Sequence, residues 1–93
     1  VKADEALRIG LVSKVVGAEA VVATAQAIAA RIAGNPPHAV RLTKQLLRGS
    51  ERNSLDEMLD KSAAFQAICH AEPDHHEAIA AFFDKRSGAY RKD

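Results

Sequence analysis

Apolar residues recur at spacings of three and four over much of the chain. The longest such run covers residues 18–33, where one stripe consists of Val21, Ala25, Ile28 and Ile32. These spacings place side chains on one face of an α-helix, and an apolar face indicates packing against other parts of a protein. The pattern therefore predicts a long helix over 18–33.

A second helix is predicted over 37–48. Pro37 suits its first turn, because proline has a helical φ and lacks the N–H group that would have no partner there. Gly49 suits its end, since glycine often follows the last helical residue. The residues predicted to point inward are Val40, Leu46 and Leu47.

Two capping patterns predict the last two helices. Ser54 and Glu57 have the spacing of a capping box, in which each side chain bonds the backbone N–H group of the other residue. The helix that follows is predicted to cover 55–71. Asp74 and Glu77 repeat the spacing and predict a final helix. The large apolar residues of that final helix are Ile79, Phe82 and Phe83.

A short helix and a strand are predicted near the N-terminus. The helix covers 3–10 and is stopped by Gly10, since glycine readily adopts the left-handed conformation found after a helix end. Residues 11–16 have the β-branched content of a strand, with apolar residues on both faces. A strand needs a neighbour for its backbone groups, and no second run in the chain offers one. We therefore expect the strand to pair with another copy or with a missing part of the protein.

The expected fold class is mostly α, with that one short strand. Alanine supplies much of the 47% hydrophobic content, whereas aromatic residues make up only 4%, which favours closely packed helices. No run approaches the about 20 apolar residues that span a bilayer, so no membrane is expected as a partner. The formal net charge of +1 gives no electrostatic argument for nucleic acid.

Two features bear on the context of the chain. Cys69 is the single cysteine, so an internal disulfide is excluded and a cytoplasmic location is expected. The chain begins with Val1 rather than with methionine. Together with the unpartnered strand, this leads us to expect a piece of a longer protein.

Three segments carry motifs of a known family in the correct order. The first, 3–16, has Ala-x-Glu-Ala followed by Gly-Leu-Val and Val-Val. The second, 27–44, has an alanine-rich stretch, a Pro-Pro break and an Ala-Val helix ending in lysine. The third, 74–86, has Asp-x-x-Glu followed by Ala-Phe-x-x-Lys-Arg. In this order and over nearly the whole chain, the motifs resemble enoyl-CoA hydratase/isomerase proteins of the crotonase superfamily.

The resemblance implies a division of labour within a longer enzyme. In this family an N-terminal core of repeated ββα turns binds an acyl-CoA thioester, and two backbone N–H groups hold the thioester oxygen as it becomes an enolate. In the hydratases, glutamates of the core handle the proton and the water. The C-terminal helices mediate trimer formation and cover the acyl-CoA site of their own or a neighbouring subunit.

For this chain, the resemblance implies that residues 1–17 end the catalytic core and that 18–93 form the C-terminal helical domain. The N-terminal catalytic core is then absent, so the chain holds no catalytic residue and is expected to be inactive alone. The implied partners are further copies, as a homotrimer or a dimer of trimers, and an acyl-CoA. No separate cofactor is expected, because the CoA thioester is the substrate. Hydration of a 2-enoyl-CoA in fatty-acid or related metabolism, a lyase reaction, is the default.

Three residues near the C-terminus match the family's substrate-contacting positions. Lys85 matches the closing lysine that contacts the phosphate-bearing end of CoA, and a lysine suits phosphate as a flexible point charge. Phe82 matches the aromatic residue that lines the acyl or pantetheine path. Arg86 matches in sequence and is the third predicted CoA-binding residue. Ala78 and Gly88 depart from the family, which often has glycine and proline there.

Plainer interpretations accompany these assignments. Phenylalanines at a helix end more often pack against protein than line a substrate site. Lys85, Arg86, Arg91 and Lys92 also suit a solvated tail that complements the negative end of a helix dipole. The main rival function is a small helical interaction module that assembles through its β-edge without affinity for CoA.

Two other kinds of site receive little support. Arg41, Lys44 and Arg48 share one helix face, but the Pro-Pro break fits poorly with the tight turn of a helix-turn-helix motif. Residues 69–77 hold many potential metal ligands, yet none has a known metal-binding spacing. We therefore expect neither nucleic acid nor a metal as a ligand.

Overall fold

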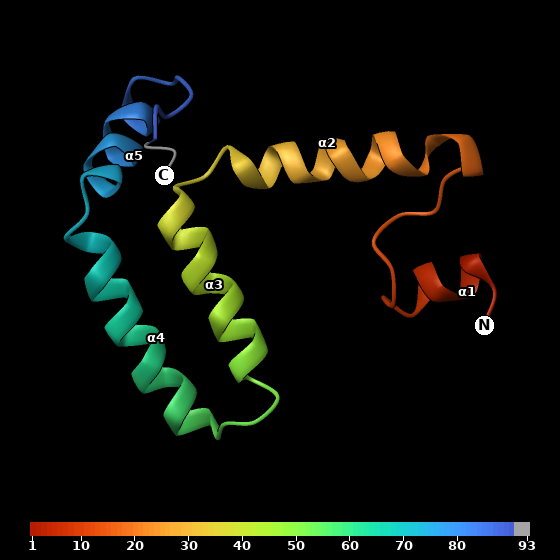
Figure 1. Cartoon of the computed structure of the whole chain (residues 1–93), viewed down its shortest axis with the longest axis horizontal. Coiled ribbons are helices and arrows are strands. Elements are labelled where there is room, and N and C mark those ends of the chain that lie inside the picture. Colours follow the sequence, from red (N-terminus) through yellow and green to blue (C-terminus); the bar gives the residue numbers. More distant parts are fainter. Residues whose placement is uncertain (91–93) are drawn as a thin grey trace. The chain divides into compact units, whose positions relative to one another are not determined.

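The computed structural model describes residues 1–90, and its described elements are all helical (Figure 1). They are α1 (Ala3–Arg8), the 3-10 helix η1 (Ala18–Ala20), α2 (Val21–Ala33), α3 (Pro37–Gly49), α4 (Leu55–His70) and α5 (Pro73–Phe83). The mostly helical fold class is confirmed, and each predicted helix has a counterpart. The chain forms two compact units, Val1–Ala30 and Arg31–Asp93.

In the first unit, α1 ends where the sequence predicted. Gly10 has a φ of 78°, the left-handed conformation that glycine adopts without a steric penalty. Its N–H group donates to the carbonyl of Leu7 at 3.2 Å, and the N–H group of Leu11 donates to Ala6 at 2.9 Å. These two bonds form a Schellman motif, which satisfies carbonyl groups at the end of a helix.

The predicted strand over 11–16 is wrong. These residues form an irregular segment, and none of the described residues 1–90 is in a strand. The N–H groups of Leu11 and Val12 both donate to the carbonyl of Ala6, so the segment starts by closing the helix end. A strand requires a neighbour, and the described part of the chain supplies none. The β-edge of the rival interaction module is therefore missing from these residues.

The valines of this segment nevertheless share an apolar surface. Val12, Val15 and Val16 line an open groove in the first unit together with residues of α1 and α2. Leu11 is 69% exposed at the same groove. The apolar character read from the sequence is thus present, but it faces open space in this unit.

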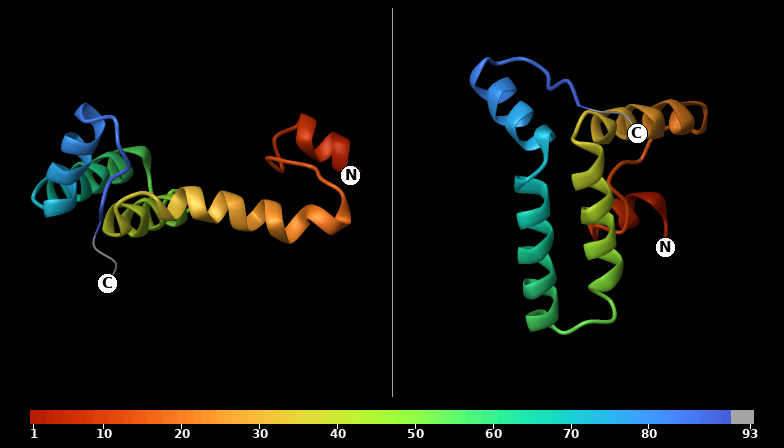
Figure 2. Two further views of the ribbon diagram at one scale, coloured as in Figure 1. Left: turned by 90° about the horizontal axis from the view of Figure 1, so that it is seen from above. Right: turned by 60° about the vertical axis from the view of Figure 1, so that its left-hand side comes forward.

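In the second unit, α3 packs against α4, and α4 packs against α5. Figures 1 and 2 show α3 and α4 running side by side in opposite directions, joined by a short turn at residues 50–54. The capping box at the start of α4 is confirmed. The N–H group of Glu57 donates to Ser54 Oγ, and the N–H group of Ser54 donates to Glu57 Oε1, both at 3.2 Å.

The second predicted capping box is wrong. Helix α5 begins at Pro73, with Glu72 at the N-cap position and no side-chain cap bond. Proline explains the earlier start, because its fixed φ is helical and it has no N–H group to satisfy. Glu77 therefore lies inside the helix, and its carboxylate is used elsewhere.

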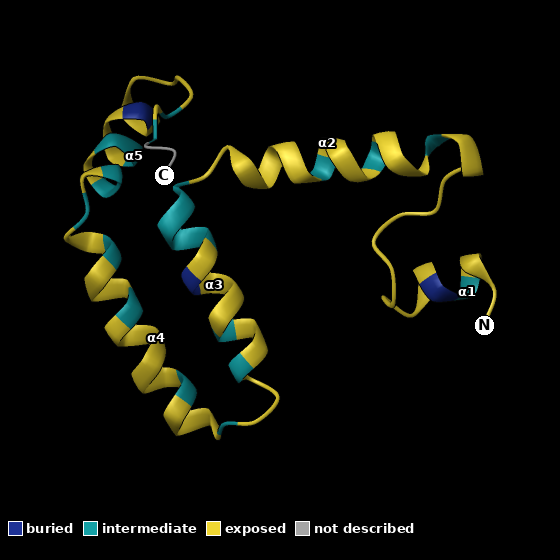
Figure 3. Ribbon diagram, viewed as in Figure 1, coloured by how far each residue is buried: buried dark blue, intermediate teal, exposed yellow. Residues whose placement is uncertain are grey.

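Few side chains are enclosed in the described residues. The buried hydrophobic residues are Ala6, Leu42 and Ala81, and Figure 3 shows most of the ribbon as exposed. Val40 and Leu46 are half-buried as predicted, but Leu47 is 68% exposed and Leu42 takes the inward position on α3. Leu42 and Leu46 lie four residues apart on one face, whereas Leu47 is turned away from it. No helix within residues 1–90 is long and apolar enough to cross a membrane.

Candidate functional site

The last turn of α5 presents two aromatic rings. Phe82 is 78% exposed and Phe83 is 75% exposed. Their ring centroids lie 5.6 Å apart in an edge-to-face arrangement. Removing aromatic side chains from water is energetically favourable. This helix end therefore offers an apolar surface to a ligand or to another protein.

Lys85 lies two residues after this aromatic pair, beyond Asp84, and has an unusual backbone conformation. Its φ is 54°, and it is the only non-glycine residue with positive φ within the described chain. The N–H group of Lys85 donates to Phe82 at 3.3 Å, and that of Arg86 donates to Ala81 at 3.0 Å. The helix end is thus a complete Schellman motif with lysine at the position that glycine usually occupies.

Arg86 is held by an ion pair with Glu77, which lies nine residues earlier on α5. Arg86 Nη1 donates to Glu77 Oε1 at 2.5 Å, and Nη2 lies 3.5 Å from Oε2. Arg86 Nε also lies 3.4 Å from Asp84 Oδ2. The guanidinium group therefore contacts two carboxylates, one inside α5 and one at its C-cap.

The carboxylate of Glu77 also binds the backbone beyond the turn. Its Oε1 accepts a hydrogen bond from the N–H group of Ala89 at 3.1 Å. The hydrogen bond from Arg86 lowers the pKa of Glu77, with a further contribution from the Ala89 N–H group. The same hydrogen bond raises the pKa of Arg86. Both changes favour the charged pair, so Glu77 links α5 to residues 86–89.

The three residues predicted to bind CoA occupy this turn. Phe82 and Lys85 are exposed, whereas Arg86 makes the contacts just described. Their role as ligand contacts stays a prediction. Sequence reasoning missed Glu77, which was assigned to a cap, and Ala89. The available signal was a lysine, in place of glycine, two positions after the last helical residue.

Gly88 has a packing role at the end of the described residues. A Cβ atom at Gly88 would lie 2.2 Å from the ring of Tyr90. The ring thus lies against the glycine backbone, and any larger residue at position 88 would displace it. The predicted tail residues Arg91 and Lys92 lie outside the described part of the chain.

Several histidines gather near the start of α5. The ring centroids of His70 and His75 lie 4.5 Å apart, and those of His75 and His76 lie 5.6 Å apart. Cys69 is half-buried nearby in the sequence. Within residues 1–90, no group of three or more His, Cys, Asp or Glu side chains is placed to hold a metal ion.

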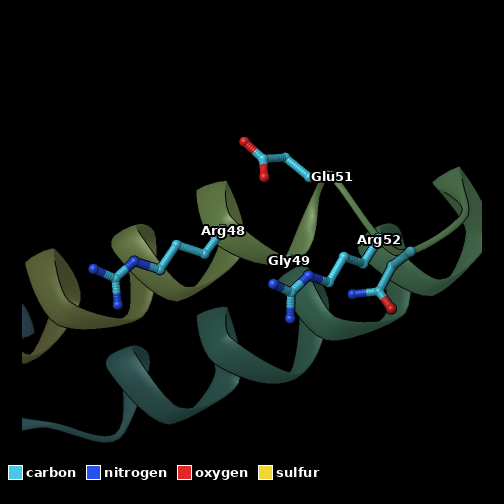
Figure 4. A pocket seen from close by; sticks show the side chains of 5 residues that line it. Arg48, Gly49, Glu51 and Arg52 are labelled. Carbon is cyan, nitrogen blue, oxygen red and sulfur yellow. The ribbon is translucent and has the colours of Figure 1, made fainter.

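A second, polar cavity lies at the turn between α3 and α4. Its lining residues are Arg48, Gly49, Glu51, Arg52 and Asn53. Figure 4 shows the guanidinium groups of Arg48 and Arg52 extending along the helices, with the carboxylate of Glu51 turned away from both. The arginines are exposed, so this feature has the character of an ordinary solvated turn.

Comparison with known proteins places these features in a family context. The enoyl-CoA hydratase/isomerase family matches residues 1–93. A short-chain-enoyl-CoA hydratase from Clostridium acetobutylicum is 41% identical over 92% of this chain and 33% of its own length. A crotonyl-CoA hydratase from Syntrophomonas wolfei is 36% identical over 97% of this chain and 35% of its own length.

Solved structures agree with these relatives. The crystal structure of an enoyl-CoA hydratase from Polaromonas sp. JS666 aligns with a TM-score of 0.92 and 27% identity. The alignment covers 98% of this chain and 35% of that one. The chain thus spans about a third of the length of the curated relatives that it matches.

Proposed function

Because the chain belongs to the enoyl-CoA hydratase/isomerase family, we propose that it is the C-terminal helical part of an enzyme acting on acyl-CoA thioesters. The observation that carries this proposal is that the family matches residues 1–93 of this chain, whereas the relatives are about three times as long. Residues 1–17 would end the catalytic core, and 18–93 would form the C-terminal domain. The chain alone would have no activity.

The proposed reaction of the complete enzyme passes through an enolate. Two backbone N–H groups of the core would stabilise the negative charge that develops on the thioester oxygen. Addition of water to a 2-enoyl-CoA is the proposed default, with core glutamates moving the proton and the water. In this arrangement the present chain assembles the enzyme and covers its substrate site, and none of its own residues is a catalytic residue.

Assembly is supported by apolar residues that the chain leaves exposed. On α4, Leu55 is 73% exposed and Leu59 is 58% exposed, and their spacing of four puts them on one face. Exposed leucines on one helix face are suited to packing against another protein surface. We propose that these faces pack against the core and against neighbouring copies in a homotrimer or a dimer of trimers.

Closure of the CoA site is assigned to the turn after α5. Phe82 supplies an exposed aromatic surface for the acyl or pantetheine part, and Lys85 supplies a cation for the phosphates. Among residues 1–90, the ammonium group of Lys85 has no carboxylate partner, so its charge is available. Arg86, the third residue predicted from the family resemblance, follows Lys85 and is paired with Glu77.

The test is steady-state kinetics with crotonyl-CoA and the complete enzyme. Replacement of Lys85 by alanine should raise KM more than it lowers kcat, because the interaction holds substrate and transition state alike. Lys44→Ala is the matched control, since Lys44 is an exposed lysine on α3. An unchanged KM for Lys85→Ala would remove Lys85 from the site.

A further inference from the structure

The chain makes the same helix-ending turn twice, with different residues at its critical position. In both turns the residue two positions after the helix has positive φ, and two backbone bonds close a Schellman motif. Gly10 occupies this position after α1, with a φ of 78°. Lys85 occupies it after α5, with a φ of 54°. The two turns therefore differ in whether the left-handed residue carries a Cβ atom.

A left-handed backbone is unfavourable for lysine. Its Cβ atom approaches the following carbonyl oxygen, a steric conflict that the right-handed conformation avoids. Such a conformation persists only where the surroundings enforce it. The turn after α1 needs no enforcement because glycine has no Cβ atom. The turn after α5 therefore requires an additional constraint.

That constraint is found in the contacts of Glu77. Its carboxylate binds the side chain of Arg86 directly after Lys85, and it accepts the N–H group of Ala89 three residues further on. Arg86 additionally donates to the carbonyl of Ser87 at 3.3 Å. The bonds to Glu77 tie the chain beyond Lys85 back onto α5, whereas the bond to Ser87 is local to the turn. A right-handed Lys85 would carry residues 86–89 away from Glu77 and break them.

We propose that Glu77 and Arg86 are positioning residues that hold Lys85 in its left-handed conformation beside Phe82. In this arrangement Arg86 serves Lys85 and does not itself bind the phosphates of CoA. The assignment of phosphate to Lys85 rests on the proposed function, whereas the coupling of Glu77 and Arg86 to the backbone of Lys85 rests on this geometry alone.

The charges around the turn support this separation of roles. Arg86 faces the carboxylates of Glu77 and Asp84, so its positive charge is balanced within the turn. Its Nη1, Nη2 and Nε atoms all make contacts there. Lys85 is exposed and forms no ion pair with a carboxylate among the described residues. An incoming phosphate group therefore meets the lysine as the available cation.

The conformational part is tested by NMR on the 93-residue chain. A left-handed residue has a short distance between its amide and α protons, so Lys85 should give a strong intraresidue NOE. Glu77→Gln and Arg86→Gln should each weaken this NOE. In Glu77→Gln, hydrogen exchange of the Arg86 amide should also become faster. The turn at Gly10 is the internal control, and protection of the Leu11 amide should not change.

A rescue experiment separates this role from general stability. In a Glu77→Gln, Lys85→Gly double variant, protection of the Arg86 amide should return, because glycine adopts the turn without help. If Glu77 instead stabilises the chain through contacts unrelated to the Lys85 backbone, the Arg86 amide should stay unprotected in the double variant. Persistence of the strong Lys85 NOE in both single variants would overturn the proposed coupling.

The kinetic part uses the complete enzyme and crotonyl-CoA. Glu77→Gln and Arg86→Gln should each raise KM by about two- to tenfold, less than or equal to the effect of Lys85→Ala. In a Lys85→Ala background they should add nothing further, since they act through Lys85. An additive effect of Arg86→Gln in that background would show direct phosphate binding and overturn the assignment. If the NOE is lost while KM stays unchanged in all three single variants, the coupling holds and the proposed CoA role of Lys85 fails.

Discussion

Nδ1 of His38 lies 2.5 Å from Oε1 of Glu72, which is 34 residues later in the chain. His38 is in the first turn of α3, and Glu72 is the N-cap residue of α5. Both side chains are about one-third exposed. The contact therefore joins the start of the second unit's first complete helix to the start of its last one.

Loss of this contact should weaken the second unit. His38→Ala is expected to lower the free energy of unfolding by about 1 kcal/mol, the size of a typical hydrogen bond in a partly exposed place. Thermal unfolding followed by circular dichroism measures the change. His76→Ala is the matched control, because His76 is exposed on α5. Equal effects of the two variants would remove the special role of the His38 contact.

The capping box of α4 makes a second prediction. Ser54→Ala removes the acceptor for the Glu57 N–H group and should destabilise the chain by about 1 kcal/mol. Ser62→Ala is the control, since Ser62 is an exposed residue inside the same helix, where alanine is favourable. Chemical denaturation of both variants gives the comparison. A Ser54→Ala variant as stable as the parent chain would contradict the cap's contribution.

Lys85→Gly should separate stability from function. Glycine removes the Cβ atom from a left-handed position, so the variant is expected to be more stable by about 1 kcal/mol. The same variant in the complete enzyme should bind acyl-CoA more weakly, because the ammonium group is gone. Thermal unfolding and KM measure the two effects. A Lys85→Gly variant that loses stability would contradict the strain inferred at this position.

The ion pair of Glu77 predicts a pH dependence. The pKa of Glu77 is lowered by its hydrogen bond with Arg86, so its folded-state pKa lies below its unfolded-state pKa. The pair therefore stabilises the turn fully at pH values above the unfolded-state pKa, and this contribution is lost as the pH falls through the folded-state pKa. NMR titration of the Glu77 carboxylate measures the shift. Arg86→Gln should return the pKa toward its ordinary value, and an unchanged value there would contradict the pairing.

The helices could be predicted from sequence because their signals are local. The apolar stripe that includes Ile28, the proline at position 37 and the pair Ser54–Glu57 each act within a turn or two of the chain. Local patterns were less reliable where the same residues suit both a strand and an irregular segment. The valines of residues 11–16 suit a strand, but a strand also needs a partner, which local sequence does not provide.

The candidate site was only half accessible to sequence reasoning. Phe82, Lys85 and Arg86 were found by resemblance to a family, and they do lie in one exposed turn. The contact of Glu77 with Arg86 was missed, because it depends on the chain reversing at a lysine rather than at a glycine. A spacing of nine residues has no local signature on a helix. Side-chain spacing alone therefore misassigned Glu77 to a cap.

The central claim is that these residues work as the C-terminal part of an acyl-CoA enzyme. The most direct test is the intact mass of the native protein, detected with an antibody raised against this chain. A species several-fold heavier than 10.0 kDa that hydrates crotonyl-CoA is the predicted result. A native species of only 10.0 kDa would contradict the claim. The residues around Lys85 would then be retained from an ancestral enzyme and would bind no CoA.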